Sequence, residues 1–184
     1  MARDDSTGPS TQRATPRHQV AWRNRRGLSE NRGDQGTIML IEFSEEFDLP
    51  VADVYPYFRT PRDWQRLYGA FGDVGDRGDG WYAVPLRGFP FPLVARVTSD
   101  EPLRSVRWEF RGFWRGEGEV RFTPTPGGVA IQGYERITIR HLPWLAPLVE
   151  RLLLESKFRK VWDSGWRRLR RQAAAGRASA VLAS

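Results

Sequence analysis

Two glutamates interrupt the apolar faces of predicted strands, and they are the residues best suited to proton-transfer chemistry. In the first predicted strand, Glu45 has the same parity as Phe43. In the last one, Glu135 has the parity of Ile137, and Gly133 leaves room beside it. Because side chains two positions apart lie on the same face of a strand, both carboxyls are predicted to face the interior. A carboxyl removed from water tends to keep its proton, which suits general acid/base catalysis on a carbonyl or enol substrate. Two other interpretations remain open: a β-bulge that turns either glutamate outward, or an ion pair with an arginine.

Other kinds of catalytic site find little support in the sequence. The chain has no Cys and only two His, so we expect no disulfide, no cysteine nucleophile, no metal and no cofactor. No G-x-S-x-G motif occurs, and the glycines between 72 and 80 lack the strand-loop-helix context of a phosphate-binding loop. His141, just before a Pro-rich helix start, is interpreted as a cap or surface residue.

The net charge of +7 is concentrated at the two ends of the chain. Residues 1–36 carry +3, residues 37–150 carry −3, and residues 151–184 carry +7. A nucleic-acid-binding domain usually has a basic face on its folded body, so we expect no specific nucleic-acid binding. The longest uninterrupted apolar run is four residues, which predicts no transmembrane segment or signal peptide and a cytoplasmic location.

The composition predicts one domain of about 37–172 between two tails. Residues 1–36 are rich in Ser, Thr, Arg and Gly without apolar periodicity, which is typical of a disordered tail. The alternative is an arm that binds a partner through Arg23, Arg25 and Arg26 beside Trp22. Residues 173–184 are Ala-rich, contain a helix stop signal at Gly176 beyond the apolar stripe, and are interpreted as a flexible tail.

The periodicity predicts strands, then short helices, then more strands, then one long helix. Alternation over 37–49 is followed by two short helical segments separated at Thr60-Pro61, and further strands are predicted at 81–87, 91–99, 105–113, 118–123 and 129–140. From Pro147 to about Gln172 the apolar residues form one helical stripe. This order predicts an α+β fold, in which a curved antiparallel sheet wraps around a long C-terminal helix with a cavity between them.

Three segments of this chain resemble the SRPBCC superfamily, the helix-grip fold of START lipid-binding domains, birch-pollen-allergen-like proteins and polyketide cyclases/dehydrases. They are EFDLPVADVYPYFRTPRDWQRL, VTSDEPLRSVRWEF and FTPTPGGVAIQGYERI, and the resemblance spans roughly 37–172. It implies that the first and last strands are antiparallel neighbours, which would bring Glu45 and Glu135 close enough to share a proton. It also implies a hydrophobic small-molecule ligand. The 36-residue leader departs from the family pattern.

Strand and helix periodicity predicts which side chains line the cavity. Mostly aromatic residues share the inward face, which is typical of a small-molecule site. The alternative for each of them is an ordinary core position. The predicted ligand-binding residues are Tyr82, Trp108, Phe110, Phe122, Ile137, Trp162 and Trp166.

Three hypotheses for function follow. The first is binding of a lipid, quinone or polyketide-like molecule in the cavity. The second is a polyketide cyclase/dehydratase-type enzyme that uses the pocket acids, Glu135 and Glu45, for proton transfer. The third is a peripheral protein whose basic C-terminal helix contacts a membrane or acidic partners. The ligand, the presence of catalysis and the oligomeric state are left open.

Overall fold

In the part of the chain that the structure describes, seven strands form a single antiparallel sheet. The computed structural model describes residues 37–69, 72–86, 89, 91–139 and 147–182. The strands are β1 (Thr37–Phe47), β2 (Gly75–Asp76), β3 (Tyr82–Val84), β4 (Leu93–Glu101), β5 (Ser105–Arg111), β6 (Trp114–Thr125) and β7 (Gly128–Ile139). The predicted tail 1–36 and His141 lie outside the described residues.

The order of strands across the sheet is β1-β7-β6-β5-β4-β3-β2, and every neighbouring pair is antiparallel. Strands β3 to β7 form the predicted meander, since consecutive strands are antiparallel neighbours, and the two-residue strand β2, which was not predicted, extends it. The first and last long strands, β1 and β7, pair along their whole length, from Thr37 opposite Ile139 to Phe47 opposite Val129. Their predicted adjacency is confirmed.

Short helices follow the first strand, as expected: α1 (Val51–Val54), the 3-10 turn η1 (Tyr55–Tyr57) and α2 (Pro61–Tyr68). Local sequence explains both ends of α2. The Thr60 hydroxyl accepts a hydrogen bond from the Asp63 backbone N–H at 3.2 Å, and Pro61 occupies the first turn, where no amide donor is needed. Gly69 ends the helix in the left-handed conformation that glycine adopts most readily.

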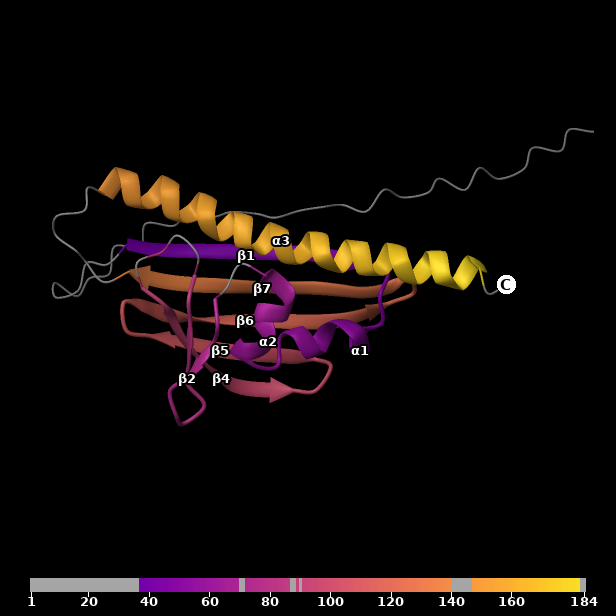
Figure 1. Ribbon diagram of the computed structural model, residues 1–184, viewed down its shortest axis with the longest axis horizontal. Helices are drawn as coiled ribbons and strands as arrows, with labels where there is room; N and C mark the ends of the chain where they lie inside the picture. Colours follow the sequence, from indigo (N-terminus) through magenta and orange to yellow (C-terminus); the bar gives the residue numbers. More distant parts are fainter. Residues whose placement is uncertain (1–36, 70–71, 87–88, 90, 140–146, 183–184) are drawn as a thin grey trace, which may run out of the picture.

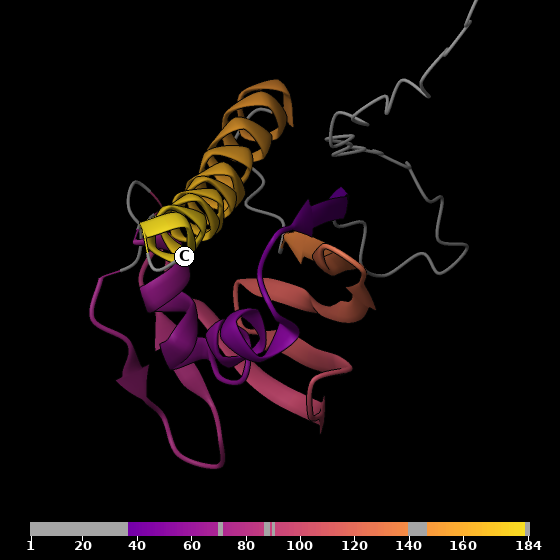
Figure 2. The ribbon, with the colours of Figure 1, turned by 90° about the vertical axis from the view of Figure 1, so that its right-hand side faces the viewer.

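The helices occupy the concave side of the curved sheet (Figures 1 and 2). Helix α3 (Pro147–Leu182) runs along the β1 side of the sheet and also contacts α2, which lies over β3 and β4. The fold is the predicted α+β helix-grip arrangement. Within the described residues, an apolar core lies between the sheet and the helices, and rings from β1, β6 and α3 pack there with Phe58, the residue after η1.

Helix α3 is longer than the sequence pattern indicated. It continues ten residues past Gln172 to Leu182, through part of the segment that we interpreted as a tail. Alanine has the highest helix propensity, and Ala173 is buried against the core, so the helix does not end where the apolar stripe thins. Gly176 lies inside the helix, with nothing within 4 Å of the place a side chain would take.

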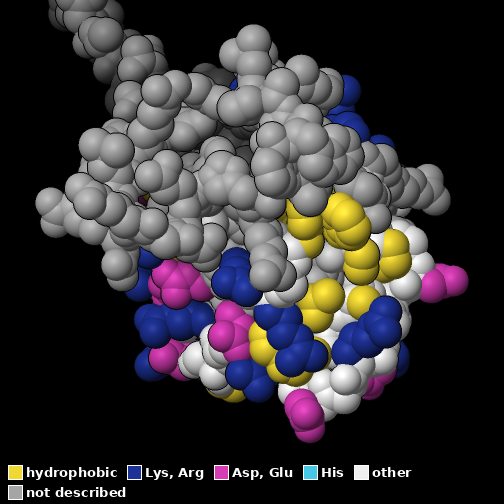
Figure 3. All heavy atoms as spheres, turned by 90° about the vertical axis from the view of Figure 1, so that its left-hand side faces the viewer, with side chains coloured by type: hydrophobic (Ala, Val, Ile, Leu, Met, Phe, Trp, Pro, Cys, Tyr) yellow, Lys and Arg dark blue, Asp and Glu magenta, His cyan; other side chains and the backbone are white. Residues whose placement is uncertain are grey.

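The convex face of the sheet carries ion pairs between neighbouring strands. Arg96 on β4 contacts Glu109 on β5, and Arg107 on β5 and Arg121 on β6 both hold Glu119. Glu119 is buried, and these two guanidiniums lower its pKa, although burial by itself would raise it. At one end of the molecule, basic, acidic and apolar side chains share the described surface (Figure 3).

Candidate functional site

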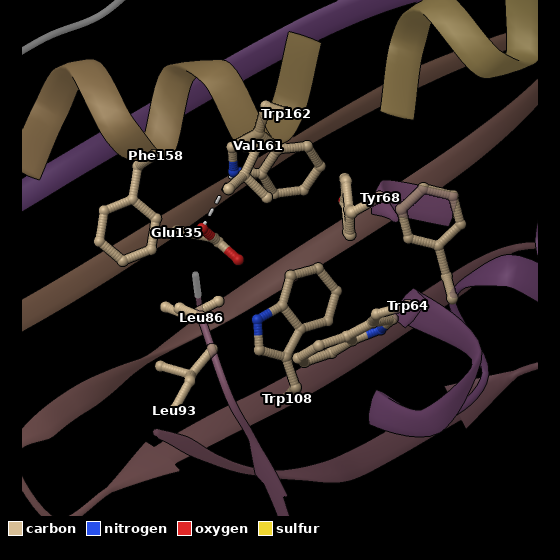
Figure 4. Close-up of a pocket in the computed structure, with 10 residues that line it drawn as sticks. Trp64, Tyr68, Leu86, Leu93, Trp108, Glu135, Phe158, Val161 and Trp162 are labelled. Atoms are coloured by element: carbon tan, nitrogen blue, oxygen red, sulfur yellow. Dashed lines mark hydrogen bonds between the residues drawn. The ribbon is translucent and has the colours of Figure 1, made fainter. Parts of the chain in front are cut away.

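A pocket lies between the middle of the sheet, α2 and α3 (Figure 4). Its walls are apolar and largely aromatic, and a single carboxyl group interrupts them. The lining residues are Phe58, Trp64, Tyr68, Leu86, Leu93, Trp108, Glu135, Phe158, Val161 and Trp162.

Four of the aromatic side chains face the pocket because of their spacing along the helices α2 and α3. Trp64 and Tyr68 are four residues apart on α2, and Phe158 and Trp162 are four residues apart on α3, so each pair shares one helix face. The Tyr68 and Trp162 rings meet edge to face with centroids 5.1 Å apart, where the two helices touch. Gly165 allows this approach, because a side chain there would come within 2.7 Å of the Tyr68 ring.

Glu135 on β7 points into this pocket and is only 7% exposed. The Trp162 indole N–H donates a hydrogen bond to its Oε2 at 3.2 Å. Burial raises the pKa of the Glu135 carboxyl to about 7, and the indoles of Trp162 and then Trp108 oppose that rise. A carboxyl with this pKa can both donate and accept a proton near neutral pH.

Trp108 on β5 lies on the other side of the carboxyl (Figure 4). Its Nε1 is buried and has no hydrogen-bond partner of normal geometry, although the indole is near enough to favour the ionised form of Glu135. The ring is held by an edge-to-face contact with Trp64 at 5.4 Å, and by the absence of a side chain at Gly118. A Cβ at Gly118 would come within 2.5 Å of Trp108 Nε1.

The Tyr68 hydroxyl is a second titratable group at the pocket. Burial raises its pKa well above the usual value, and the negative charge on ionised Glu135 adds to the rise. Tyr68 therefore keeps its proton across the physiological range, and its hydroxyl is a permanent hydrogen-bond donor.

Side chains leave little enclosed space in the pocket. Its empty volume is about 390 Å³ when space open to solvent is included, but the enclosed part holds only about one water molecule. A ligand of several rings therefore requires the rings that wall the pocket, or α3 itself, to move apart.

Glu45 is buried, as its strand parity predicted, but it does not form a pair with Glu135. The β1–β7 register places Glu45 opposite Ile131 and Glu135 opposite Ile41, an offset of four residues or about 13 Å along the strands. Glu45 instead accepts a hydrogen bond from Arg170 on α3. The expectation of a shared proton is wrong, and the arginine ion pair considered for either glutamate applies to Glu45.

The other predicted lining residues separate into two groups. Trp108 and Trp162 line the pocket. Phe110, Phe122, Ile137 and Trp166 are buried in the core outside the lining: Phe122 packs on Tyr55 and Phe58, and Trp166 packs on Phe43 and Phe47. Tyr82, on the short strand β3, is half-buried, with the Arg62 guanidinium over its ring. Strand parity predicts which face a residue occupies, but not where along that face the pocket lies.

Sequence analysis did not identify several pocket residues as part of a site. Trp64, Tyr68 and Phe158 were not among the residues predicted to line the cavity. Their spacing in the sequence could have predicted this role. Tyr68 is four residues from Trp64, and Phe158 is four residues from Trp162, so each pair shares a helix face.

Among the described residues, no group of His, Cys, Asp or Glu side chains is arranged to hold a metal ion. None of the helices in this part of the chain has both the length and the apolar character needed to cross a bilayer.

The sequence of this chain also matches a known protein family. The family model described as polyketide cyclase / dehydrase and lipid transport matches residues 40–174, which include every residue of the pocket. The chain belongs to this family. A search of curated proteins finds no match.

Solved structures of similar fold include a conserved protein from Geobacillus kaustophilus, with 13% identity and a TM-score of 0.56, in which 74% of this chain aligns with 96% of that chain. Protein Ms6760 from Mycobacterium smegmatis has 14% identity and a TM-score of 0.51, with 74% and 92% covered. The di-domain aromatase/cyclase StfQ from the steffimycin biosynthetic pathway has 15% identity and a TM-score of 0.55, with 77% and 52% covered. At these identities the likeness shows the fold that this member of the polyketide cyclase/dehydrase and lipid transport family shares with them.

Proposed function

We propose that this protein binds a small hydrophobic molecule in the pocket between the sheet and α3, and that Glu135 is the group that interacts with its polar atoms. The observation that carries the proposal is a buried carboxyl, with a pKa of about 7, in a wall of aromatic side chains. A buried ionisable group without an ionic partner is costly to keep, and such groups concentrate at functional sites. Family membership supports the same function.

Catalysis by Glu135 is the second candidate, favoured by that pKa. A general acid or base works best when its pKa is near the working pH, because both protonation states are then populated. As a carboxylate, Glu135 would take a proton from a carbon next to a carbonyl and leave an enolate; as the acid, it would give that proton to the enolate oxygen to form the enol. Glu45 has no part in this proposal, since it does not line the pocket and is bonded to Arg170.

The experiment is native mass spectrometry of the full chain purified from its own host, beside the E135Q and E46Q variants. Glu46 is exposed on β1, so E46Q is a matched control. We expect a bound mass on the wild type and on E46Q, and less of it on E135Q. A bound mass that is unchanged in E135Q would place the ligand elsewhere, and a chain without any bound mass would argue against a stably held ligand.

The hypothesis of a peripheral interaction stays a prediction. The described part of α3 exposes several cations, among them Arg159, Lys160, Arg167, Arg168 and Arg171. Exposed charge attraction is screened by salt, so the hypothesis requires sedimentation with anionic lipid vesicles at low salt and release at high salt. A protein that stays in the supernatant at low salt would contradict it.

A further inference from the structure

The Trp108 indole N–H is a buried hydrogen-bond donor at the pocket that lies near Glu135 but outside normal hydrogen-bond geometry. Trp108 is only 2% exposed, and its Nε1 makes no hydrogen bond of normal geometry. A buried donor left without a partner is costly, because it has lost its hydrogen bonds to water and gained none in the protein. Native proteins rarely keep such a group, and a ligand that supplies the acceptor would recover this free energy when it binds.

The donor is fixed in direction before any ligand arrives. Trp108 lies opposite Gly118 in the β5–β6 register, and the missing side chain at Gly118 gives the indole its place. Trp64 packs edge to face against the other side of the ring. Figure 4 shows the Trp108 nitrogen on the side of the ring that faces Glu135 and Leu86, and the Trp64 nitrogen turned away from the carboxyl.

The groups around this donor define the atom that fits. Trp162 already donates to Glu135 Oε2, so its N–H is in use. Trp108 therefore offers an unused N–H next to the carboxyl, which offers an O–H when it is protonated. An oxygen with two lone pairs can accept from both of these donors.

We propose that the pocket selects ligands that carry a carbonyl oxygen, and that the Trp108 N–H binds this oxygen beside Glu135. This inference rests on the proposed function and adds the chemical class of the ligand and the residue that selects it. Trp108 is then a specificity-determining residue: it discriminates a ketone from a hydrocarbon of the same shape. The discrimination is strong because a hydrocarbon in the pocket would leave the buried Trp108 N–H without an acceptor, whereas a ketone supplies one.

The test compares two small probes on the full chain at pH 6. Acetophenone carries the carbonyl, and isopropylbenzene has nearly the same shape without it. Dissociation constants are measured by NMR titration for the wild type, W108F and W166F. Trp166 is the matched control, since its Nε1 is also buried without a partner but the residue does not line the pocket.

We expect W108F to weaken acetophenone binding about tenfold and to leave isopropylbenzene binding within about twofold, since a net hydrogen bond is worth about one factor of ten. W166F should change the two affinities equally. Equal effects of W108F on both probes, or none on either, would overturn the carbonyl selection while the pocket stands. Failure of the wild type to bind either probe would overturn the proposed function together with this inference.

A second measurement covers the case in which W108F does not fold. A crystal of the wild-type chain soaked in acetophenone should show the carbonyl oxygen within about 3.2 Å of Trp108 Nε1. A ring in the pocket with its carbonyl directed elsewhere would refute the inference.

Discussion

Glu45 and Glu135 are both buried, lie on neighbouring strands and face the same core, yet their surroundings are opposite. Glu45 is held by the Arg170 guanidinium, whose side chain is 43% exposed, so its charge is matched near the surface. Glu135 faces an apolar, largely aromatic pocket wall and, among the described residues, accepts its hydrogen bond from the neutral Trp162 indole. The same residue type thus supports packing of α3 in one place and carries a titratable proton in the other, because the neighbours differ.

The largest expected effect distinguishes the two glutamates by pH. The folded-state pKa of Glu135 is about 7, above the ordinary value of 4.5, so the folded chain prefers the protonated carboxyl. The contribution of Glu135 to stability is therefore fully present below about pH 4.5, falls as the pH rises, and is lost above about pH 7. This shift corresponds to a loss on the order of 3 kcal/mol.

The measurement is urea unfolding of the wild type and of E135Q between pH 4 and 8. Subtracting one stability curve from the other removes the contribution of other groups, including Glu119. We expect the wild type to lose stability relative to E135Q across this range. A difference that stays flat would show that the Glu135 carboxyl titrates normally.

An intermediate effect is expected when Glu45 loses its cation. R170M leaves a carboxyl that is 3% exposed without its guanidinium, and also removes the contact of Arg170 with the Phe47 ring. Breaking a fully buried ion pair costs 3–5 kcal/mol, and the exposure of Arg170 reduces this to about 2 kcal/mol. Thermal unfolding beside R171M, an exposed neighbour on α3, checks the value. Equal stability of the two variants would mean that the Glu45–Arg170 pair contributes nothing net.

The smallest effect is expected from crowding the indole beside Glu135. G118A would press a methyl group against Trp108 Nε1, which costs about 1–3 kcal/mol, while replacing a strand glycine returns up to about 1 kcal/mol. We expect a net loss of about 1 kcal/mol and a shift of the Trp108 indole N–H resonance. G75A is the control, because nothing lies within 4 Å of the position that its methyl group would take. An unmoved resonance in G118A would show that the ring is not fixed by Gly118.

The sequence determined the order of elements and the buried face of each strand. Period-two alternation in β1 and β7 placed Glu45 and Glu135 toward the core, and both are buried. The stripe after Pro147 predicted the long helix, and Thr60-Pro61 marked the break before α2. These features are local, because strand parity, helix periodicity and caps act over only a few residues.

Only the tertiary structure decided which of these buried residues form the site. The distance between the two glutamates follows from the register of two strands that are more than eighty residues apart in the chain. The Glu45–Arg170 and Glu135–Trp162 contacts follow from how α3 crosses the sheet. No periodicity encodes a crossing, since many side chains on the helix and the sheet set it together. Strand parity therefore predicted that Glu45 and Glu135 are buried, and packing decided that Glu45 is paired with a cation while Glu135 faces a pocket.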